Sequence, residues 1–243
     1  MKIRALSVRM LKEILRDPLN LCFGAGFPLL LLILLHTIDA HGPMEQFRME
    51  RLAPGAAVFG LSFLTLFSAT VISRDRESAL LHRLYTAPLT ARHFILGYTL
   101  PMLPLALLQC ALCYAAGLLL GLEWTGNILP ATVLILPDAL LYIALGLLCG
   151  TLLNVRQVGA VCGALLTNLT AWLSGIWFDV SLLGSFLEKL SAVLPFSHAV
   201  EMERAAVRGD LSAILPHLGI VTAYGFALLA VAAALFSRRI QKQ

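Results

Sequence analysis

The chain has 243 residues, of which 59% are hydrophobic and only 13% are charged, and its mean hydropathy is +0.84. Soluble domains carry about 25% charged residues, and they do not need uninterrupted apolar runs of about 20 residues. The composition therefore excludes an ordinary soluble protein and predicts an integral membrane protein.

Six apolar segments are long enough to cross a bilayer, because a helix rising about 1.5 Å per residue covers the roughly 30 Å hydrocarbon core. Helices are expected because unpaired backbone groups are costly in lipid, and the alternation of barrel strands is missing. The sequence predicts an all-α membrane protein with a single transmembrane domain over residues 1–243. The expected spans are 19–38, 54–73, 94–122, 128–154, 158–178 and 218–236.

The distribution of Lys and Arg sets the expected orientation. Most of the 18 basic residues gather near the N-terminus, in the stretch 74–92 and at the C-terminal end, whereas most acidic residues fall in the other loops. The positive-inside rule then places both termini in the cytoplasm. The net charge of +4 follows from this bias, and no nucleic-acid partner is expected.

Residues 2–17, KIRALSVRMLKEILRD, have a helical period. Apolar residues form one stripe, and charged residues, among them Arg9, Lys12, Glu13 and Arg16, fill the rest. A basic amphipathic helix of this kind lies on an anionic membrane surface. Two interpretations stay open, a lipid-surface anchor and a helix that also contacts a cytoplasmic partner.

The stretch 73–94, SRDRESALLHRLYTAPLTARHF, is charged and separates the second and third spans. Ser73 can cap a helix that begins at Arg74, and Pro88 would stop it. This helix of roughly three turns would lie across the cytoplasmic ends of the two spans. A mere connection needs about two to eight residues, so the extra length indicates a docking surface. The alternative is a solvated loop with some helix.

Three Gly-x-x-x-Gly pairs occur in the expected spans, at 117–121, 146–150 and 159–163. Small residues one turn apart let two helices approach closely. We interpret these pairs as packing within the chain, with the seam of a dimer as the alternative.

Asp138 is the one charged residue inside an expected span. A charge at this depth costs a few kcal/mol unless water or a partner reaches it, and such residues often serve function. Asp138 could contact a cationic substrate on its path. The competing interpretation is a water-accessible residue that lines an outer vestibule.

The segment 179–217 is expected outside the cell. Its first part, SLLGSFLEKLSAVLPF, has a broad apolar face but is too short and too charged to span, so a re-entrant or interfacial helix is expected. Pro195 breaks it. The next part, SHAVEMERAAVRGD, is expected to form another helix with Glu201, Arg204 and Arg208 exposed.

The sequence lacks the motifs of several enzyme classes. It has no Gly-x-x-x-x-Gly-Lys-Ser/Thr loop for phosphates and no His-Glu-x-x-His pair, and its six His residues are scattered. No catalytic residue, no metal site and no bound cofactor are therefore expected in this chain.

These features together resemble the membrane subunit of an ABC-2 type exporter, the permease family that includes daunorubicin-type drug efflux pumps. The resemblance covers nearly the whole chain and depends on the N-terminal helix, on RDRESALLHRLYTAPLTARHFILGY and on LPFSHAVEMERAAVRGD. The family often has Glu-x-Gly-Thr-Leu followed by a Thr-Pro pair. Here ESALL at 77–81 and TAP at 86–88 stand in those places, so the Gly-Thr is lost.

The resemblance implies a multi-pass permease in the cytoplasmic membrane of a bacterium. Two six-span subunits, identical or related, would form the core, and two copies of a separate ATP-binding subunit would dock beneath it and use ATP and Mg. The implied cargo is a hydrophobic or amphiphilic drug, peptide or lipid-like molecule moved outward. The alternatives are a polysaccharide or glycolipid exporter, and a six-span channel or scaffold outside the ABC class.

The resemblance also assigns roles to residues of this sequence. It makes 2–16 a connecting helix and 74–85 a coupling helix against the ATP-binding subunit. Leu80, Leu81 and Leu84 would be apolar anchors, and charged residues around them would set the register. The expected coupling residues are Arg74, Asp75, Arg76, Glu77, Leu80, Leu81, Arg83, Leu84, Tyr85 and Pro88.

Overall fold

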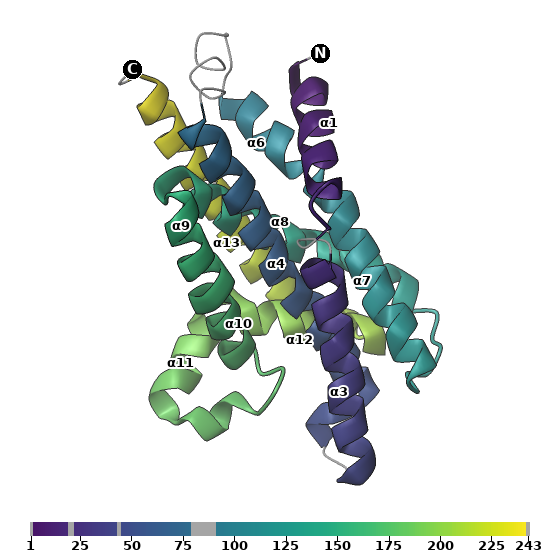
Figure 1. Ribbon diagram of the computed structural model, residues 1–243. Coiled ribbons are helices and arrows are strands. Elements are labelled where there is room, and N and C mark those ends of the chain that lie inside the picture. The colour runs from purple at the N-terminus through teal and green to yellow at the C-terminus, as the bar shows by residue number, and fades with distance from the viewer. Residues whose placement is uncertain (1, 19–21, 43–44, 79–90, 242–243) are drawn as a thin grey trace.

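The computed structural model describes residues 2–18, 22–42, 45–78 and 91–241, and every regular element within these ranges is a helix. The main helices form an elongated bundle (Figure 1). They are α1 (Lys2–Leu15), α3 (Phe27–His41), α4 (Met49–Glu77), α6 (Ala91–Thr99), α7 (Met102–Leu119), α8 (Ile128–Leu152), α9 (Val155–Val158), α10 (Thr167–Leu173), α11 (Ser185–Val193), α12 (Pro195–Arg208) and α13 (Leu211–Gln241). Shorter turns are the π-helical η1 (Cys22–Gly26) and η3 (Gly159–Leu166) and the 3-10 turns η2 (Glu45–Phe47) and η4 (Val180–Leu183).

Five helical segments of the described chain are long and apolar enough to cross a membrane. They are Cys22–His41, Met49–Glu77, Arg92–Leu119, Ile128–Leu152 and Leu211–Arg238, which correspond to five of the six expected spans. The expected span 158–178 coincides instead with a succession of α9, the π-helical η3 and α10. The all-helical class is therefore confirmed, and the sixth crossing stays a prediction.

α4 is the central helix of the bundle. Within its apolar window 89% of the residues are buried by the rest of the chain, against 11% for the first span and 17% for the last. α4 packs against α8, α7, α12 and α3. The small residues Ala53, Ala56, Ala57 and Gly60 on α4 are buried, so neighbouring helices come close to its backbone. A displacement of α4 would therefore reach most of the other helices.

The contact between α4 and α8 depends on glycine. A Cβ atom placed on Gly146 would lie 2.7 Å from the carbonyl oxygen of Thr65, and one on Gly150 would lie 2.8 Å from that of Ala69. These distances leave no room for any side chain, which confirms packing within the chain for the 146–150 pair. A Cβ on Gly159 would meet nothing within 4 Å, so the dimer interpretation of the 159–163 pair remains untested.

The expected third span is broken near its N-terminal end. α6 ends at Thr99, and α7 begins after Pro101, which has no N–H to donate to the preceding turn. The break lets α6 leave the direction of α7 and lie beside α1 (Figure 1). α1 begins and α13 ends at this same end of the bundle (Figure 1).

The expected external segment forms two short helices, α11 and α12, neither of which is long enough to cross a bilayer. α11 ends before Pro195, where a break was expected, and α12 begins at this proline, two residues earlier than expected; α12 is capped by Gly209, whose φ of +74° is typical of a helix C-terminus. α12 packs against α13, α4 and α8, and most of its residues are buried. Its position relative to a membrane stays a prediction.

Candidate functional site

The amphipathic N-terminal helix packs on the bundle through its predicted apolar stripe. Met10 and Ile14 on α1 are 1% and 3% exposed. Ser7 donates a hydrogen bond to the carbonyl oxygen of Gly97 on α6 at 3.2 Å, and Leu6 lies where a side chain at position 97 would be. α1 is therefore attached to α6 and does not rest on lipid alone.

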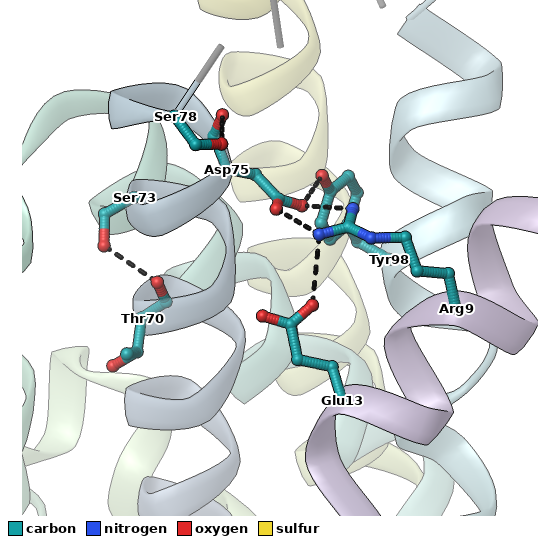
Figure 2. Close-up of polar contacts among 7 residues, drawn as sticks. All are labelled: Arg9, Glu13, Thr70, Ser73, Asp75, Ser78 and Tyr98. Atoms are coloured by element: carbon teal, nitrogen blue, oxygen red, sulfur yellow. Dashed lines mark hydrogen bonds and ion pairs between the residues drawn. The ribbon is translucent and has the colours of Figure 1, made fainter. Parts of the chain in front are cut away.

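An ion pair joins α1 to the end of α4 (Figure 2). The guanidinium of Arg9 donates from Nη1 to Oδ2 of Asp75 at 2.9 Å and from Nη2 to Oδ1 at 2.5 Å. The hydroxyl of Tyr98 on α6 donates to the same Oδ2 at 2.6 Å, and Glu13 accepts from Arg9 at 3.1 Å. The carboxylate of Asp75 on α4 therefore connects α4 to α1 and α6 through hydrogen bonds.

The environment of this pair makes it stronger than a surface ion pair. The side chain of Asp75 is only 4% exposed, and both of its oxygens accept from charged or phenolic donors. The hydrogen bond to Asp75 raises the pKa of Arg9, and burial together with the nearby Asp75 charge raises the pKa of Glu13. Removing one partner would leave a buried charge unpaired, which typically costs about 3–5 kcal/mol.

The two residues that follow Asp75 at the end of α4 contact the connection between α8 and α9. Arg76 donates to the carbonyl oxygens of Thr151 and Leu153, the latter at 2.6 Å. The carboxylate of Glu77 accepts from the backbone N–H of Val155 at 2.9 Å. These bonds fasten the last turn of α4 to the turn 151–155.

We call these five residues, Arg9, Asp75, Arg76, Glu77 and Tyr98, the junction. The junction joins α1, α4, α6 and the turn 151–155, all at the end of the bundle where α1 begins. Its α4 residues lie just before the stretch 79–90 in the sequence, and Tyr98 on α6 lies just after it. A force applied at this end would be distributed to four parts of the chain at once.

The expected coupling residues fall into two groups. Asp75, Arg76 and Glu77 belong to the junction, and Arg74 is exposed on α4. The other expected coupling residues, Leu80, Leu81, Arg83, Leu84, Tyr85 and Pro88, lie outside the described residues. Of the expected connecting-helix residues, Arg9 and Glu13 join the ion pair, and Lys12 and Arg16 are exposed.

The expected cap at Ser73 is wrong. α4 continues without interruption through Ser73 to Glu77, and the hydroxyl of Ser73 donates back to the carbonyl oxygen of Thr70 within the helix. The residues Arg74–Glu77 therefore end the second span and do not begin a separate helix. The reason is that Asp75, Arg76 and Glu77 all find partners in the bundle and hold this turn in place.

Tyr98 was not recognised from the sequence as a functional residue. It looks like one more aromatic residue of an apolar span, but it is 1% exposed and its hydroxyl faces Asp75. Buried tyrosine hydroxyls usually find a partner, so a tyrosine close to the charged end of a span is a usable signal.

Arg204 was expected to be exposed, and this is wrong. Its side chain is 6% exposed and donates to the carbonyl oxygens of Arg51 and Gly175, at 3.3 and 3.0 Å, and to the carboxylate of Glu201 at 2.8 Å. Glu201 keeps 42% of its side chain exposed, and Arg208 is exposed. Arg204 and Glu201 line a polar cavity of about 310 Å³ at the end of the bundle opposite the junction.

Asp138 does not line a water-filled vestibule in this structure, because it has no exposed surface at all. It lies near the middle of α8, inside the bundle. The expectation that it contacts a cationic substrate stays a prediction.

Two comparisons with known proteins indicate the family of this chain. The "Putative transport permease ycf38" of Pyropia yezoensis is 32% identical over 126 residues, which cover 49% of this chain and 43% of that relative. The match thus spans less than half of the relative's length. The sequence model of the family described as "ABC-2 type transporter" matches residues 1–207. This second match covers most of the chain, including every residue of the junction, and the chain therefore belongs to the ABC-2 type transporter family.

Proposed function

We propose that this chain is the membrane subunit of an ATP-driven exporter, and that a separate ATP-binding subunit docks on the end of the bundle that carries the junction. The observation that supports this most directly is the Arg9–Asp75–Tyr98 network. It links an amphipathic helix to the two helices that flank the stretch 79–90, the end of α4 before it and α6 after it, and the family resemblance assigns 74–85 to coupling.

The arrangement fits a subunit that receives mechanical work. The chain has no phosphate-binding loop of its own, so work would have to enter through contact with a partner. A partner that pressed on 79–90 would move the end of α4. Because α4 is the central helix and α1, α6 and the turn 151–155 are fastened to it, the movement would spread through the bundle.

The cargo proposed is a hydrophobic or amphiphilic molecule, moved outward across the cytoplasmic membrane by two such permeases and two ATP-binding subunits. The matched relative carries the name of a transport permease, which agrees with a transport role. The family resemblance provides the direction of export and the class of cargo.

Affinity purification of the tagged chain from its own membranes tests the partnership. We expect it to recover a protein that contains the Gly-x-x-x-x-Gly-Lys-Ser/Thr loop. Leu84→Asp is expected to reduce this recovery at least about tenfold, because it places a charge at an apolar anchor.

Leu182→Asp is the matched control, since Leu182 is 76% exposed on η4 at the opposite end of the bundle. It makes the same substitution away from the proposed contact and should leave recovery unchanged. Equal recovery with Leu84→Asp and with the unmodified chain, at equal membrane insertion, would contradict the proposed docking surface.

A further inference from the structure

Two carboxyl groups lie buried in the interior of the bundle, apart from the junction. Asp138 lies on α8 and Glu203 on α12, and these two helices pack together. Both residues are 0% exposed. The hydroxyl of Tyr114 on α7 donates to Oε2 of Glu203 at 2.7 Å.

The other three oxygens of this pair have no hydrogen-bond partner among the described residues. They are Oδ1 and Oδ2 of Asp138 and Oε1 of Glu203. Buried polar atoms nearly always have partners, and an ionised carboxylate needs several. A buried pair of carboxylates in which only Glu203 receives a donor is therefore an incomplete site, and a positively charged ligand would complete it.

The groups around the pair provide no positive charge. α7 contributes Cys110 and Tyr114, and α8 contributes Tyr142. On α12 the neighbouring Arg204 directs its donors to Glu201 and to the carbonyl oxygens of Arg51 and Gly175. None of these described groups can balance a negative charge at Asp138 or Glu203.

Apart from those on α4, the described arginines on the other helices that pack on α8 are Arg92 on α6, Arg156 on α9 and Arg238 on α13, and all three are exposed. The ionisable residues of α4 all lie within its first three and last four positions, far from its middle. On α13, His217 pairs with His198 at 2.8 Å, and Tyr224 donates to the carbonyl oxygen of Val193. On α6, Tyr98 is bound to Asp75.

We propose that Asp138 and Glu203 form a proton-binding site inside the permease, in which the two carboxyl groups hold an exchangeable proton between them. A carboxyl group that carries a proton is neutral, and its O–H can donate to an oxygen of its neighbour. One proton thus removes a buried charge and satisfies two of the unpartnered oxygens. Two carboxyl groups that share a site bind a proton for this reason in other proteins.

A proton fits this site better than a metal ion. Metal ions require several ligand atoms around them, and no group of three or more His, Cys, Asp or Glu side chains that could hold a metal ion occurs among the described residues. A proton needs one oxygen and no additional volume. Intramembrane carboxyl groups are common in proton pathways.

Labelling of the unmodified chain with a hydrophobic carbodiimide tests the proposal, because this reagent adds to protonated carboxyl groups in apolar surroundings and leaves a stable adduct. We expect peptide mass spectrometry to find the adduct on Asp138 or Glu203 and not on the exposed Glu123. Burial raises the pKa of Glu203 to about 8, so this acid keeps its proton below that pH and releases it above. Labelling should therefore fall as the pH rises through about 8.

Infrared spectroscopy of the protein in lipid reads the same site without depending on reagent access. We expect the C=O band of protonated carboxyl groups to persist at neutral pH and to decrease in both Asp138→Asn and Glu203→Gln, but not in the control Glu123→Gln. Tyr114→Phe removes the hydrogen bond that favours the ionised form of Glu203. The titration of the band should then shift upward by about one pH unit.

Three results would overturn the proposal. One is a protonated-carboxyl band that is the same in Asp138→Asn, Glu203→Gln and the unmodified chain. Another is an unchanged pH midpoint for the titration of this band in Tyr114→Phe. The third is a loss of the band when sodium ions are added at constant pH, which would identify a metal-cation site. The measurements need neither substrate nor ATP-binding partner. Their outcome therefore does not depend on whether the proposed function is correct.

Discussion

Arg9→Glu is expected to lower the free energy of unfolding by about 3–5 kcal/mol, since it leaves the carboxylate of Asp75 buried without its cation and adds a third carboxylate beside Glu13. It is also expected to reduce ATP hydrolysis by the reconstituted complex at least about tenfold, because the end of α4 is no longer fastened to α1. Thermal unfolding in detergent and the ATPase rate measure the two effects.

Lys12→Glu is the matched control for this variant. It makes the same change of charge on the same helix, at a side chain that is exposed to solvent. It should change both quantities little, because exposed charges contribute about 0–1 kcal/mol. The exchange Arg9→Asp with Asp75→Arg restores an ion pair and should recover part of the lost stability. Equal behaviour of Arg9→Glu and Lys12→Glu would show that the Arg9–Asp75 pair has no special role.

Gly150→Ala is expected to destabilise the bundle by about 1–3 kcal/mol although alanine favours helices. The added Cβ would lie 2.8 Å from the carbonyl oxygen of Ala69 and 2.8 Å from Cβ of Ile72, so α4 and α8 would have to separate. Size-exclusion chromatography after heating should show a lower melting temperature and less folded protein.

Gly159→Ala provides the comparison for Gly150→Ala. The same methyl group added at position 159 meets nothing within 4 Å, so the melting temperature should stay the same. A fall in the melting temperature only for Gly159→Ala would mean that the pair 159–163 forms the critical contact, as expected for the seam of a dimer.

The lengths of the apolar segments in the sequence were sufficient to predict most of the fold. Uninterrupted apolar runs determined five of the spans, since any such run must be helical in lipid. The break at Pro101 and the π-helical η3 could not be predicted in detail. Proline shows where a helix can break, but packing against α1 and α4 decides whether the two pieces change direction.

The sequence was sufficient to select the charged residues of the site, but it did not identify the groups that they contact. Arg9 and Asp75 are 66 residues apart, and they were expected in two separate elements, the connecting helix and the coupling helix. The structure buries Asp75 since Arg9 and Tyr98 satisfy its oxygens together. Arg204 was misjudged for a similar reason, because two carbonyl oxygens from distant parts of the chain and the carboxylate of the nearby Glu201 compensate its burial.

Photo-cross-linking from defined positions tests the central claim most directly, that work enters at the junction end through an ATP-binding partner. A photoreactive amino acid would replace Lys12 on α1, Leu84 in the stretch 79–90, or the 74% exposed Trp124 at the opposite end. We predict cross-links to the ATP-binding protein from positions 12 and 84, with a yield that changes on addition of ATP, and none from position 124. Cross-links to that protein from position 124, with none from positions 12 and 84, would contradict the account.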